Sequence, residues 1–520
     1  MEVNVNLEFG ELHNEAERFV DYHVKNGRGD NIAIITDAKN YTYKEVMENC
    51  NRTGNALRSL GLGMEDRVML VALDCPEFVY TFWGAMKIGA VPIPTNTMWV
   101  PADYLYALND SKAKVLVVSK ELLPGIIVNK DKFIYLKKIF VIGGPAEGEE
   151  DFGAFISGFP TECETAPTTK DDMAFWLYSS GSTGAPKGTV HLHHNCSYVG
   201  ELYGRGVLEF TEKDRVYSVA RLFFAYGLGN ALLFPFWVGA AAILDPGRPL
   251  PDHLYSVIAK HKPTVFSGVP TAFNNMLQVK GAKEKYDMSS VRISNSAGEP
   301  LPGAIYQQWK DMWGVEILDG IGSTEILHIY ISNRIGQSKP DSSGIPVAGY
   351  EAKIVDNDGN VLPDGESGLL LMKGESTAAY YYNKHEKTKS AFQGYWFNTG
   401  DQYVKNADGT YTYAGRGDDM IKAGGIWVSP IEVENALMMH PDVLEAGVVG
   451  QEDEDALVKP KAFVVFKEGV EVTDALLDDV KMFVKKSIAP YKFPRWIVAA
   501  KELPKTATGK IQRFKLRETK

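Results

Sequence analysis

The sequence predicts an α/β fold with two domains, a large N-terminal one and a small α+β C-terminal one joined by a hinge. Over the first two-thirds of the chain, short apolar segments alternate with helix-like segments, which indicates parallel-rich sheets covered by helices. Tight-turn signals beyond residue 344 indicate a small antiparallel, barrel-like part of the N-terminal domain. The length of 520 residues exceeds what one hydrophobic core usually serves, so we expect at least two domains.

The N-terminal elements follow the pattern of alternating strands and helices. The β-branched run 67–72 predicts a strand, and a helix over 76–86 and a strand over 90–94 follow it. Further strands are expected at 114–118, 139–142, 173–178, 264–267, 291–296 and 315–318, with a helix over 302–313 before the last of these. The apolar tract 229–244 contains Pro235 and is short for a membrane span, so we interpret it as buried core.

The pattern changes in the last third. Antiparallel strands are expected at 351–355 and 368–372 around the turn 358–360, and 407–410 is a second hairpin signal. A helix over 430–439, strands at 443–449 and 461–466, a helix over 473–486 and a strand at 495–499 form the predicted α+β unit. Glycine and short polar residues at 416–419 suit a hinge, so we predict domains 1–417 and 418–520.

Composition excludes several classes of function. The net charge of −11 opposes non-specific attraction to nucleic acid and to anionic membranes. The four cysteines are scattered without CxxC pairing, which fits a reduced cytosol and disfavours redox or metal motifs. The N-terminus has no apolar signal core, so we expect a cytoplasmic protein. His191, His193 and His194 have no carboxylate or cysteine beside them, and we do not expect them to bind a metal.

The loop 179–188, SSGSTGAPKG, follows the expected buried strand 173–178. Its glycines allow the backbone to approach a ligand, and its hydroxyls and Lys187 supply donors and a positive charge, an inventory that suits a polyphosphate. The spacing differs from GxxxxGK[ST], which disfavours an ordinary P-loop NTPase. Composition alone is also compatible with a flexible surface loop.

Five segments in order resemble those of the acyl- and aryl-CoA synthetases of the adenylate-forming superfamily. They are 179–188, SAGEP at 296–300, DGIGSTE at 319–325, YWFNTGD at 395–401 with GRGDDMIK at 415–422, and PKTATGK at 504–510. Within the superfamily, the stretches 176–191, 221–230 and 491–495 are most similar to the benzoate-CoA ligase branch.

The resemblance implies a site for ATP and Mg²⁺. Thr324 would donate to the phosphates, Glu325 would bind Mg²⁺, and Asp401 would accept the ribose hydroxyls with help from Arg416. As alternatives, Glu325 could cap a helix and Arg416 could form an exposed salt bridge. Asp319 would lie near the exocyclic amine of adenine, and Ile321 stands where many relatives carry a stacking tyrosine. The other implied nucleotide residues are Ser179, Ser180, Gly181, Ser182, Thr183, Gly184, Lys187, Ala297, Gly298, Glu299, Gly320, Gly322 and Ser323.

By the same resemblance, the reaction has two halves, adenylation of the acid and then formation of the CoA thioester, and the C-terminal domain would serve both. By resemblance, Lys510 bridges the substrate carboxylate and the α-phosphate during adenylation. The resemblance implies that the domain would then rotate about a hinge at Asp418, and that Lys422, Gly424, Gly425 and Trp427 would line the tunnel for the pantetheine chain of CoA. Trp427 stands where some relatives place an arginine, and packing is its alternative role.

The acid pocket is expected to draw on the loop near residue 225 and on residues after Glu325. Its predicted members are Phe224, Ala225, Tyr226, Gly227, His328 and Ile329. Aromatic and small side chains suit a flat apolar ring, although these residues could instead be core. Phe224 replaces a histidine that is common in the superfamily.

These features predict an AMP-forming ligase that converts benzoate or a close analogue into its CoA thioester. An alicyclic acid such as cyclohexanecarboxylate, a substituted benzoate or a medium-chain acid is the alternative substrate, and a carrier-bound thiol the alternative acceptor. The retained Lys187, Glu325, Asp401 and Lys510 disfavour a non-catalytic nucleotide-binding relative. The expected partners are the acid, ATP and CoA, without nucleic acid or membrane, for a monomer or homodimer.

Overall fold

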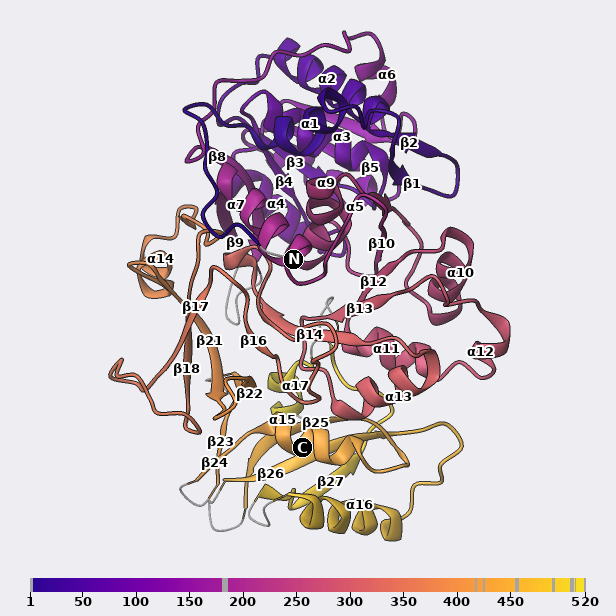
Figure 1. Cartoon of the computed structure of the whole chain (residues 1–520), viewed down its shortest axis with the longest axis vertical. Helices are drawn as coiled ribbons and strands as arrows, with labels where there is room; N and C mark the ends of the chain where they lie inside the picture. The colour runs from indigo at the N-terminus through magenta and orange to yellow at the C-terminus, as the bar shows by residue number, and fades with distance from the viewer. Residues whose placement is uncertain are drawn as a thin grey trace.

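The structure is a computed structural model that describes residues 3–179, 186–416, 419–423, 426–453, 458–488, 492–505, 509 and 511–518. For residues 416, 422, 423, 426 and 427 it describes the backbone alone. The predicted α/β architecture is confirmed: parallel-rich sheets with helices form the upper part of Figure 1, antiparallel strands lie to one side, and the C-terminal domain lies below.

A nine-stranded sheet forms the centre of the N-terminal part. Its strands run in the order β16, β15, β14, β13, β12, β10, β11, β1, β2, and the six from β14 to β1 are parallel. Their bounds are β1 (Ile32–Ile35), β2 (Asn40–Thr42), β10 (Arg215–Ser218), β11 (Ala241–Ile243), β12 (Val265–Gly268), β13 (Ile293–Ser296), β14 (Ile317–Gly322), β15 (Ile329–Ser332) and β16 (Ile345–Pro346).

A second, fully parallel sheet lies beside the first. It has the order β4 (Val91–Pro94), β3 (Arg67–Val71), β5 (Val115–Ser119), β6 (Lys138–Ile142), β7 (Glu150–Asp151). Helix α3 (Pro76–Lys87) packs on it and is buried on all sides, and α2 (Tyr43–Ser59) packs on α3. Proline at the first position of α3 suits a helix start, because its missing N–H would have no intrahelical partner there.

Two antiparallel sheets complete the N-terminal part. One pairs β8 (Met173–Ser179) with β9 (Lys187–Leu192), and β9 with β19 (Tyr380–Tyr381). The other contains β17 (Glu351–Val355), β18 (Ser367–Lys373), β20 (Phe392–Gln393), β21 (Trp396–Lys405) and β22 (Tyr411–Arg416). The expected strands around 358–360 and the hairpin at 407–410 are thus confirmed.

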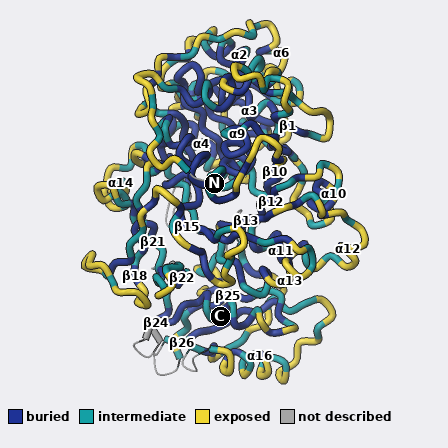
Figure 2. Tube along the Cα trace, in the orientation of Figure 1, coloured by how far each residue is buried: buried dark blue, intermediate teal, exposed yellow. Residues whose placement is uncertain are grey.

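Two main cores cover the nine-stranded sheet. Helices α10 (Pro251–His261), α11 (Pro270–Leu277) and α13 (Gly303–Trp313) supply the core on one face, with Trp309 and Phe273 fully buried. The largest core contains α2, α3 and the tract 229–244, which is buried as predicted (Figure 2). The remaining N-terminal helical segments are η1 (Glu17–Asp21), α1 (Tyr22–Lys25), α4 (Pro101–Ser111), α5 (Leu123–Ile127), η2 (Lys130–Lys132), α6 (Phe152–Ser157), α7 (His193–Val199), η3 (Gly200–Arg205), α8 (Ala225–Leu228), η4 (Gly229–Leu233), α9 (Phe234–Val238), α12 (Ala282–Lys285), η5 (Thr324–Ile326) and α14 (His385–Ala391).

The C-terminal domain has small cores of its own. Its described elements are β23 (Ile421–Ala423), β24 (Ile426–Val428), α15 (Pro430–Met438), β25 (Val443–Glu452), β26 (Val458–Phe466), α16 (Asp474–Ser487), β27 (Trp496–Ala499) and α17 (Arg513–Glu518). The predicted helices and strands of this unit are confirmed, and β23, β24 and α17 are additional. The boundary between 417 and 418 lies outside the described residues and stays a prediction.

One predicted strand extends well past its expected end. The strand expected at 315–318 is β14, which begins at Ile317 and continues through Asp319 and two glycines to Gly322. It continues because β15 pairs with it, Gly320 opposite Ser332 and Ile321 opposite Ile331. Tertiary pairing therefore overrides the weak strand propensity of glycine. Among the described residues, no helix has the length and apolar character needed to cross a membrane.

Candidate active site

A cavity of about 820 Å³ lies where β13 and β14 end, between the N-terminal part and the C-terminal domain. Both parts of the chain line it, which brings together segments more than two hundred residues apart. From the N-terminal part these include Ser179, Lys187, Gly298, Glu299, Asp319, Gly320, Ile321, Gly322, Ser323, Thr324, Glu325, Tyr381 and Asp401. From the C-terminal domain they include Asp419, Glu434, Asn435, Glu445, Lys505 and Arg513.

Glu325 is the centre of one end of this cavity. Its Oε1 accepts hydrogen bonds from Tyr381 Oη at 2.8 Å and Ser179 Oγ at 3.2 Å. Lys187 Nζ lies 3.8 Å from the same oxygen and 4.1 Å from the centre of the Tyr381 ring. A carboxylate and an ammonium group therefore face one space, where anionic oxygens and a cation can both be held.

Backbone contacts fix the short helix η5 that carries Glu325. Its N-cap is Ser323, whose Oγ accepts from the Ile326 N–H, so Glu325 is not the capping residue. The carbonyl of Thr324 accepts from His191 Nε2 at 2.8 Å. Burial lowers the pKa of His191 to about 4, so the ring is neutral at pH 7 and serves η5 as a fixed donor. Among the described residues, no group of histidines, cysteines and carboxylates has the arrangement of a metal cluster.

The ends of β13 and β14 form another part of the cavity lining. Asp319 is buried, and its Oδ1 has no hydrogen-bond partner among the described residues. Burial raises the pKa of the Asp319 carboxyl well above its ordinary value. Ala297 is buried and Gly298 has φ +94°, a conformation that favours glycine. Ile321 lines the cavity with an aliphatic side chain.

Asp401 approaches the cavity from the antiparallel sheet. It lies on β21 directly opposite Arg416 of β22 in the ladder, and its own N–H donates to Thr399 Oγ1 at 3.1 Å. The backbone register thus brings the two predicted ribose residues to neighbouring positions of one hairpin.

The predicted acid-pocket residues form an adjoining group. The rings of Tyr226 and His328 stack with centroids 5.5 Å apart, and His328 Nε2 lies 3.2 Å from the Tyr226 carbonyl. Since that carbonyl can only accept, Nε2 carries the proton; burial lowers the pKa of His328 to about 3, which keeps the ring neutral. Tyr226 Oη donates to the carbonyls of Gly268 and Asn295, both at 3.0 Å.

The other members of that group differ in burial. Phe224 and Ala225 are half-buried, whereas Gly227 and Ile329 are buried, and Ile329 packs on Gly320. Among the described residues that line the 820 Å³ cavity, none of the six predicted acid-pocket residues is found. The structure therefore gathers Tyr226 and His328 beside the Glu325 turn without making them part of that cavity.

Several predicted site residues lie outside the described residues. They are Ser180, Gly181, Ser182, Thr183, Gly184, Asp418, Gly424, Gly425 and Lys510. Arg416, Lys422 and Trp427 are described by their backbone alone, and the last two pair across the β23–β24 hairpin. Gly509, next to Lys510, is described: a Cβ built on it would lie 2.7 Å from Glu299 Oε1, so this segment reaches the cavity.

Sequence reasoning missed two features of the site. Tyr381 contacts both Glu325 and Lys187, and it belongs to a run of three tyrosines that was the only available signal. In the C-terminal domain, Arg513 Nη2 donates to both carboxylate oxygens of Glu434, at 2.7 and 3.0 Å.

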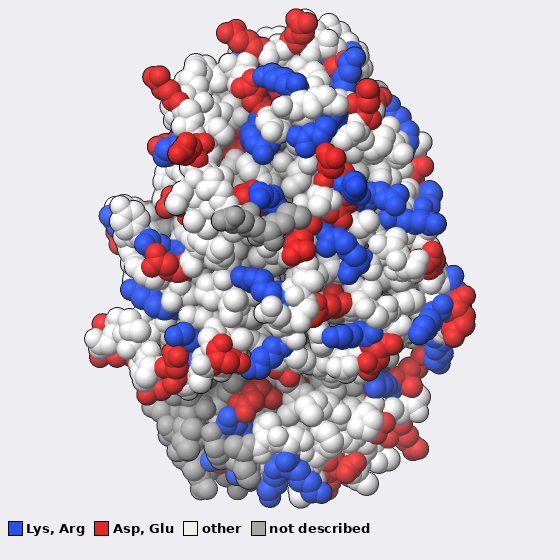
Figure 3. Space-filling model, in the orientation of Figure 1, with Lys and Arg blue, Asp and Glu red and all other residues white. Residues whose placement is uncertain are grey.

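Figure 3 shows Lys/Arg and Asp/Glu residues interspersed over the viewed face, so that face presents no field of a single sign.

Family models match most of the chain. The model described as "AMP-binding enzyme" matches residues 21–382, and "AMP-binding enzyme C-terminal domain" matches residues 432–510. Together they include the described cavity residues from Lys187 to Tyr381 and from Glu434 to Lys505.

Known proteins are similar over nearly the whole length. A benzoate–CoA ligase from Thauera aromatica is 48% identical over 513 residues, covering 98% of this chain and 97% of its own. The crystal structure of the anthranilate CoA ligase AuaEII in complex with anthranoyl-AMP superposes with a TM-score of 0.94 at 42% identity, covering 98% and 97%. That of a benzoate CoA ligase from Burkholderia xenovorans LB400 gives 0.90 at 43% identity, covering 97% and 100%.

Proposed function

The chain belongs to the AMP-binding enzyme family, and from that premise we propose that it is an ATP- and Mg²⁺-dependent aryl-CoA ligase. It activates an aromatic carboxylic acid, benzoate or a close analogue, to the acyl-adenylate and then to the CoA thioester, releasing AMP and pyrophosphate. The observation that carries the proposal is the 820 Å³ cavity, with Glu325 and Lys187 at one end and Asp319 and Asp401 along the rest.

The cavity residues fit ATP. The buried Asp319 Oδ1 lacks a partner among the described residues and suits the amino group of adenine, while Asp401 suits the ribose hydroxyls. Lys187 supplies positive charge for the β- and γ-phosphates, together with the loop 180–185 that lies outside the described residues. Ile321 gives adenine an aliphatic contact in place of aromatic stacking.

The Glu325 carboxylate fits Mg²⁺, because hard cations prefer carboxylate oxygens and this group faces the phosphate end of the cavity. Ser179 and Tyr381 donate to Oε1, which fixes the orientation of the carboxylate as outer-shell donors do at metal sites. When bound, Mg²⁺ neutralises phosphate charge and orients the phosphate oxygens.

In the first half-reaction, a carboxylate oxygen of the acid attacks the α-phosphorus, and the bond from that phosphorus to the bridging oxygen of pyrophosphate breaks. Lys187 holds the leaving group. Lys510, whose neighbour Gly509 lies beside Glu299, bridges the carboxylate and the α-phosphate.

In the second half-reaction, the CoA sulfur attacks the acyl carbon, and the bond from that carbon to the AMP oxygen breaks. This step requires Lys510 to leave the site, which we assign to rotation of the C-terminal domain about Asp418. The hairpin of Lys422 and Trp427, with Gly424 and Gly425, then lines the path of the thiol.

An aromatic acid is supported by the stacked rings of Tyr226 and His328 beside the Glu325 turn, since flat rings pack well against a flat substrate. The similarity to proteins named benzoate–CoA ligase supports the same class. A substituted benzoate, an alicyclic acid or a medium-chain acid would use the same chemistry. The four free cysteines support a reducing, cytoplasmic setting.

A pyrophosphate-release screen tests the proposal. Benzoate, hydroxybenzoates, cyclohexanecarboxylate and straight-chain acids are each supplied with MgATP, with and without CoA, and the thioester is identified by mass. We expect sustained turnover that requires CoA and is fastest with an aromatic acid. Fastest turnover with an alicyclic or straight-chain acid would overturn the assignment of the acid, and no turnover with any acid would overturn the ligase activity.

A further inference from the structure

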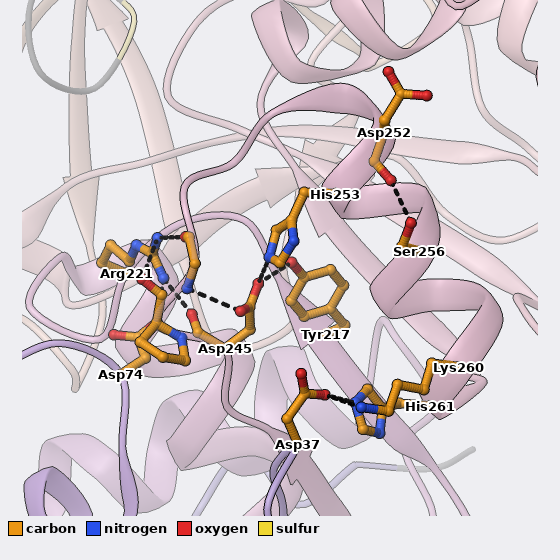
Figure 4. Close-up of polar contacts among 12 residues, drawn as sticks. Asp37, Asp74, Tyr217, Arg221, Asp245, Asp252, His253, Ser256, Lys260 and His261 are labelled. Atoms are coloured by element: carbon orange, nitrogen blue, oxygen red, sulfur yellow. Dashed lines mark hydrogen bonds and ion pairs between the residues drawn. The ribbon is translucent and has the colours of Figure 1, made fainter.

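A polar network joins loops at the carboxyl ends of three parallel strands from two different sheets (Figure 4). Asp74 follows β3 of the five-stranded sheet, whereas Arg221 and Asp245 follow the adjacent strands β10 and β11 of the nine-stranded sheet. None of these residues lines the 820 Å³ cavity among its described members. Carboxyl ends of parallel strands are where α/β proteins hold ligands, so a network there can control a pocket.

Arg221 is the centre of the network. Its Nη1 donates to the Asp245 carbonyl and lies 3.7 Å from Asp74 Oδ2, while Nη2 donates to the carbonyls of Gly247 and, at 3.5 Å, Pro246. The side chains of Arg221 and Asp74 are only 17% and 6% exposed. One guanidinium thus binds three carbonyls and a carboxylate, which the single ammonium of a lysine does not reproduce.

The two carboxylates hold the loops that receive the guanidinium. Asp74 Oδ1 accepts from the Leu222 N–H at 3.1 Å, next to Arg221 itself. Asp245 Oδ1 accepts from the Gly247 N–H at 2.9 Å, and its Oδ2 accepts from Tyr217 Oη and contacts His253 Nε2, both at 2.8 Å. Asp74 and the Asp245 loop, which both contact the Arg221 guanidinium, are therefore each held in place by hydrogen bonds of their own.

The backbone of Arg221 contacts the segment that follows it, and that segment carries residues of the proposed acid pocket. The Phe224 N–H donates to the Arg221 carbonyl at 3.0 Å. A Cβ on Gly227 would lie 2.0 Å from the same carbonyl oxygen, so α8 packs directly on the backbone of Arg221. Phe224 and Tyr226 belong to the short segment that these two contacts hold, so a shift of the Arg221 backbone moves both residues.

We propose that Arg221, tied to Asp74, is a positioning residue that sets where the Phe224–Tyr226 wall meets the ring of the carboxylic acid. It acts without touching the substrate. The inference rests on the proposed function, in which Tyr226 and His328 bind the acid. Loss of the Arg221 contacts should therefore weaken binding of the acid selectively. The ATP end of the cavity, built from β13, β14 and β21, keeps its geometry.

The test compares Arg221→Lys with the matched variant Arg292→Lys in the full chain. Arg292 also binds one carboxylate, Asp214, and two carbonyls, those of Leu208 and Glu209, but near the start of β10. Pyrophosphate release gives KM for ATP and for the acid that the wild type uses best. For Arg221→Lys we expect KM for the acid to rise about tenfold or more, a changed ratio of kcat/KM between benzoate and cyclohexanecarboxylate, and KM for ATP within about twofold. Arg292→Lys should leave all three unchanged.

Equal increases in both KM values, or the same acid effect in Arg292→Lys, would overturn the positioning role. If Arg221→Lys does not fold, Asp74→Asn replaces it, because Asn keeps an acceptor for the Leu222 N–H and removes the charge; a smaller shift in the same direction is expected, and an unchanged acid preference overturns the role. If the wild-type protein itself has no activity on any of the acids, the proposed function is overturned instead.

Discussion

At the scale of single residues, the proposed phosphate end of the site depends on how Glu325 is oriented. Tyr381 Oη donates to Oε1, and the electron-rich face of the same ring lies 4.1 Å from Lys187 Nζ. One side chain thus orders both the anion and the cation. Burial, and then the Glu325 charge, raise the pKa of Tyr381, so its hydroxyl stays protonated and remains a donor.

Tyr381→Phe should therefore keep the ring and lose the donor. Because a hydrogen bond to a charged group contributes about 1.5 to 3 kcal/mol, we expect kcat/KM for MgATP to fall on the order of tenfold to a hundredfold. The Mg²⁺ concentration for half-maximal rate should rise with it. Tyr380→Phe is the matched control, since the Tyr380 hydroxyl contacts Met173 Sδ instead of the site. Unchanged Mg²⁺ dependence in Tyr381→Phe would contradict the role.

At the scale of elements, β14 lines the cavity with its last four residues, which we propose bind the nucleotide, and its close packing depends on glycine. A Cβ at Gly320 would lie 2.7 Å from the Ile331 carbonyl oxygen and 2.8 Å from Ile329 Cγ2. Neither atom belongs to a flexible chain end, so β15 has to move. The close approach of β15 also holds Ile329 over the strand, which links the nucleotide end to the proposed acid pocket.

Gly320→Ala should accordingly destabilise the protein by about 1 to 3 kcal/mol, as overpacked cores do, and should raise KM for both ATP and the acid. Urea unfolding and pyrophosphate release measure the two effects. Gly63→Ala is the control, because its Cβ meets nothing within 4 Å and its backbone is not left-handed. Equal stability of the two variants would show that β15 yields without cost.

Periodicity predicted most elements of this fold, including β3 and β5, because apolar, β-branched runs form parallel strands that are buried on both faces. It did not predict that β14 continues to Gly322, since that depends on a ladder with β15. Motif spacing indicated Glu325 and Lys187. Tyr381 was not predictable in the same way, because β19 reaches the site only by pairing with β9, some 190 residues earlier along the chain.

At the scale of the whole molecule, several buried histidines make the fold sensitive to acid. Burial lowers the pKa of His23 and His191 to about 4, and of His193 and His328 to about 3. Between these values and the ordinary pKa of 6.5, the unfolded chain binds more protons than the folded one. The contribution of these neutral rings to the free energy of unfolding is therefore fully present above pH 6.5, and it is lost as the pH drops toward 4.

We expect each buried ring to remove about 2 kcal/mol of unfolding free energy at pH 5 relative to pH 7.5. Urea midpoints at the two pH values measure the total. His23→Gln should flatten this dependence, whereas replacement of the exposed His385 should not alter it. A dependence on pH that is identical in wild type and His23→Gln would contradict the assignment.

The two domains contact each other beside the proposed nucleotide cavity. Asn435 Nδ2 on α15 donates to Asp341 Oδ1 at 3.1 Å, and Asn274 Nδ2 donates to the Leu444 carbonyl at 3.3 Å. Because residues from both domains line the cavity, this arrangement suits the proposed adenylation step. In the proposed mechanism the thioester step needs these contacts to break, so we expect the strength of the interface to set the balance between the two half-reactions.

Asn435→Asp tests this balance, because it places a second carboxylate against Asp341 and repels the C-terminal domain from the closed arrangement. We expect single-turnover adenylate formation to slow by about tenfold, while thioester formation from supplied acyl-adenylate proceeds at the wild-type rate or faster. Adding Asp341→Asn should restore adenylation, since the pair then regains one donor and one carboxylate. Equal slowing of both half-reactions, or no rescue in the double variant, would show that this contact does not control the closure.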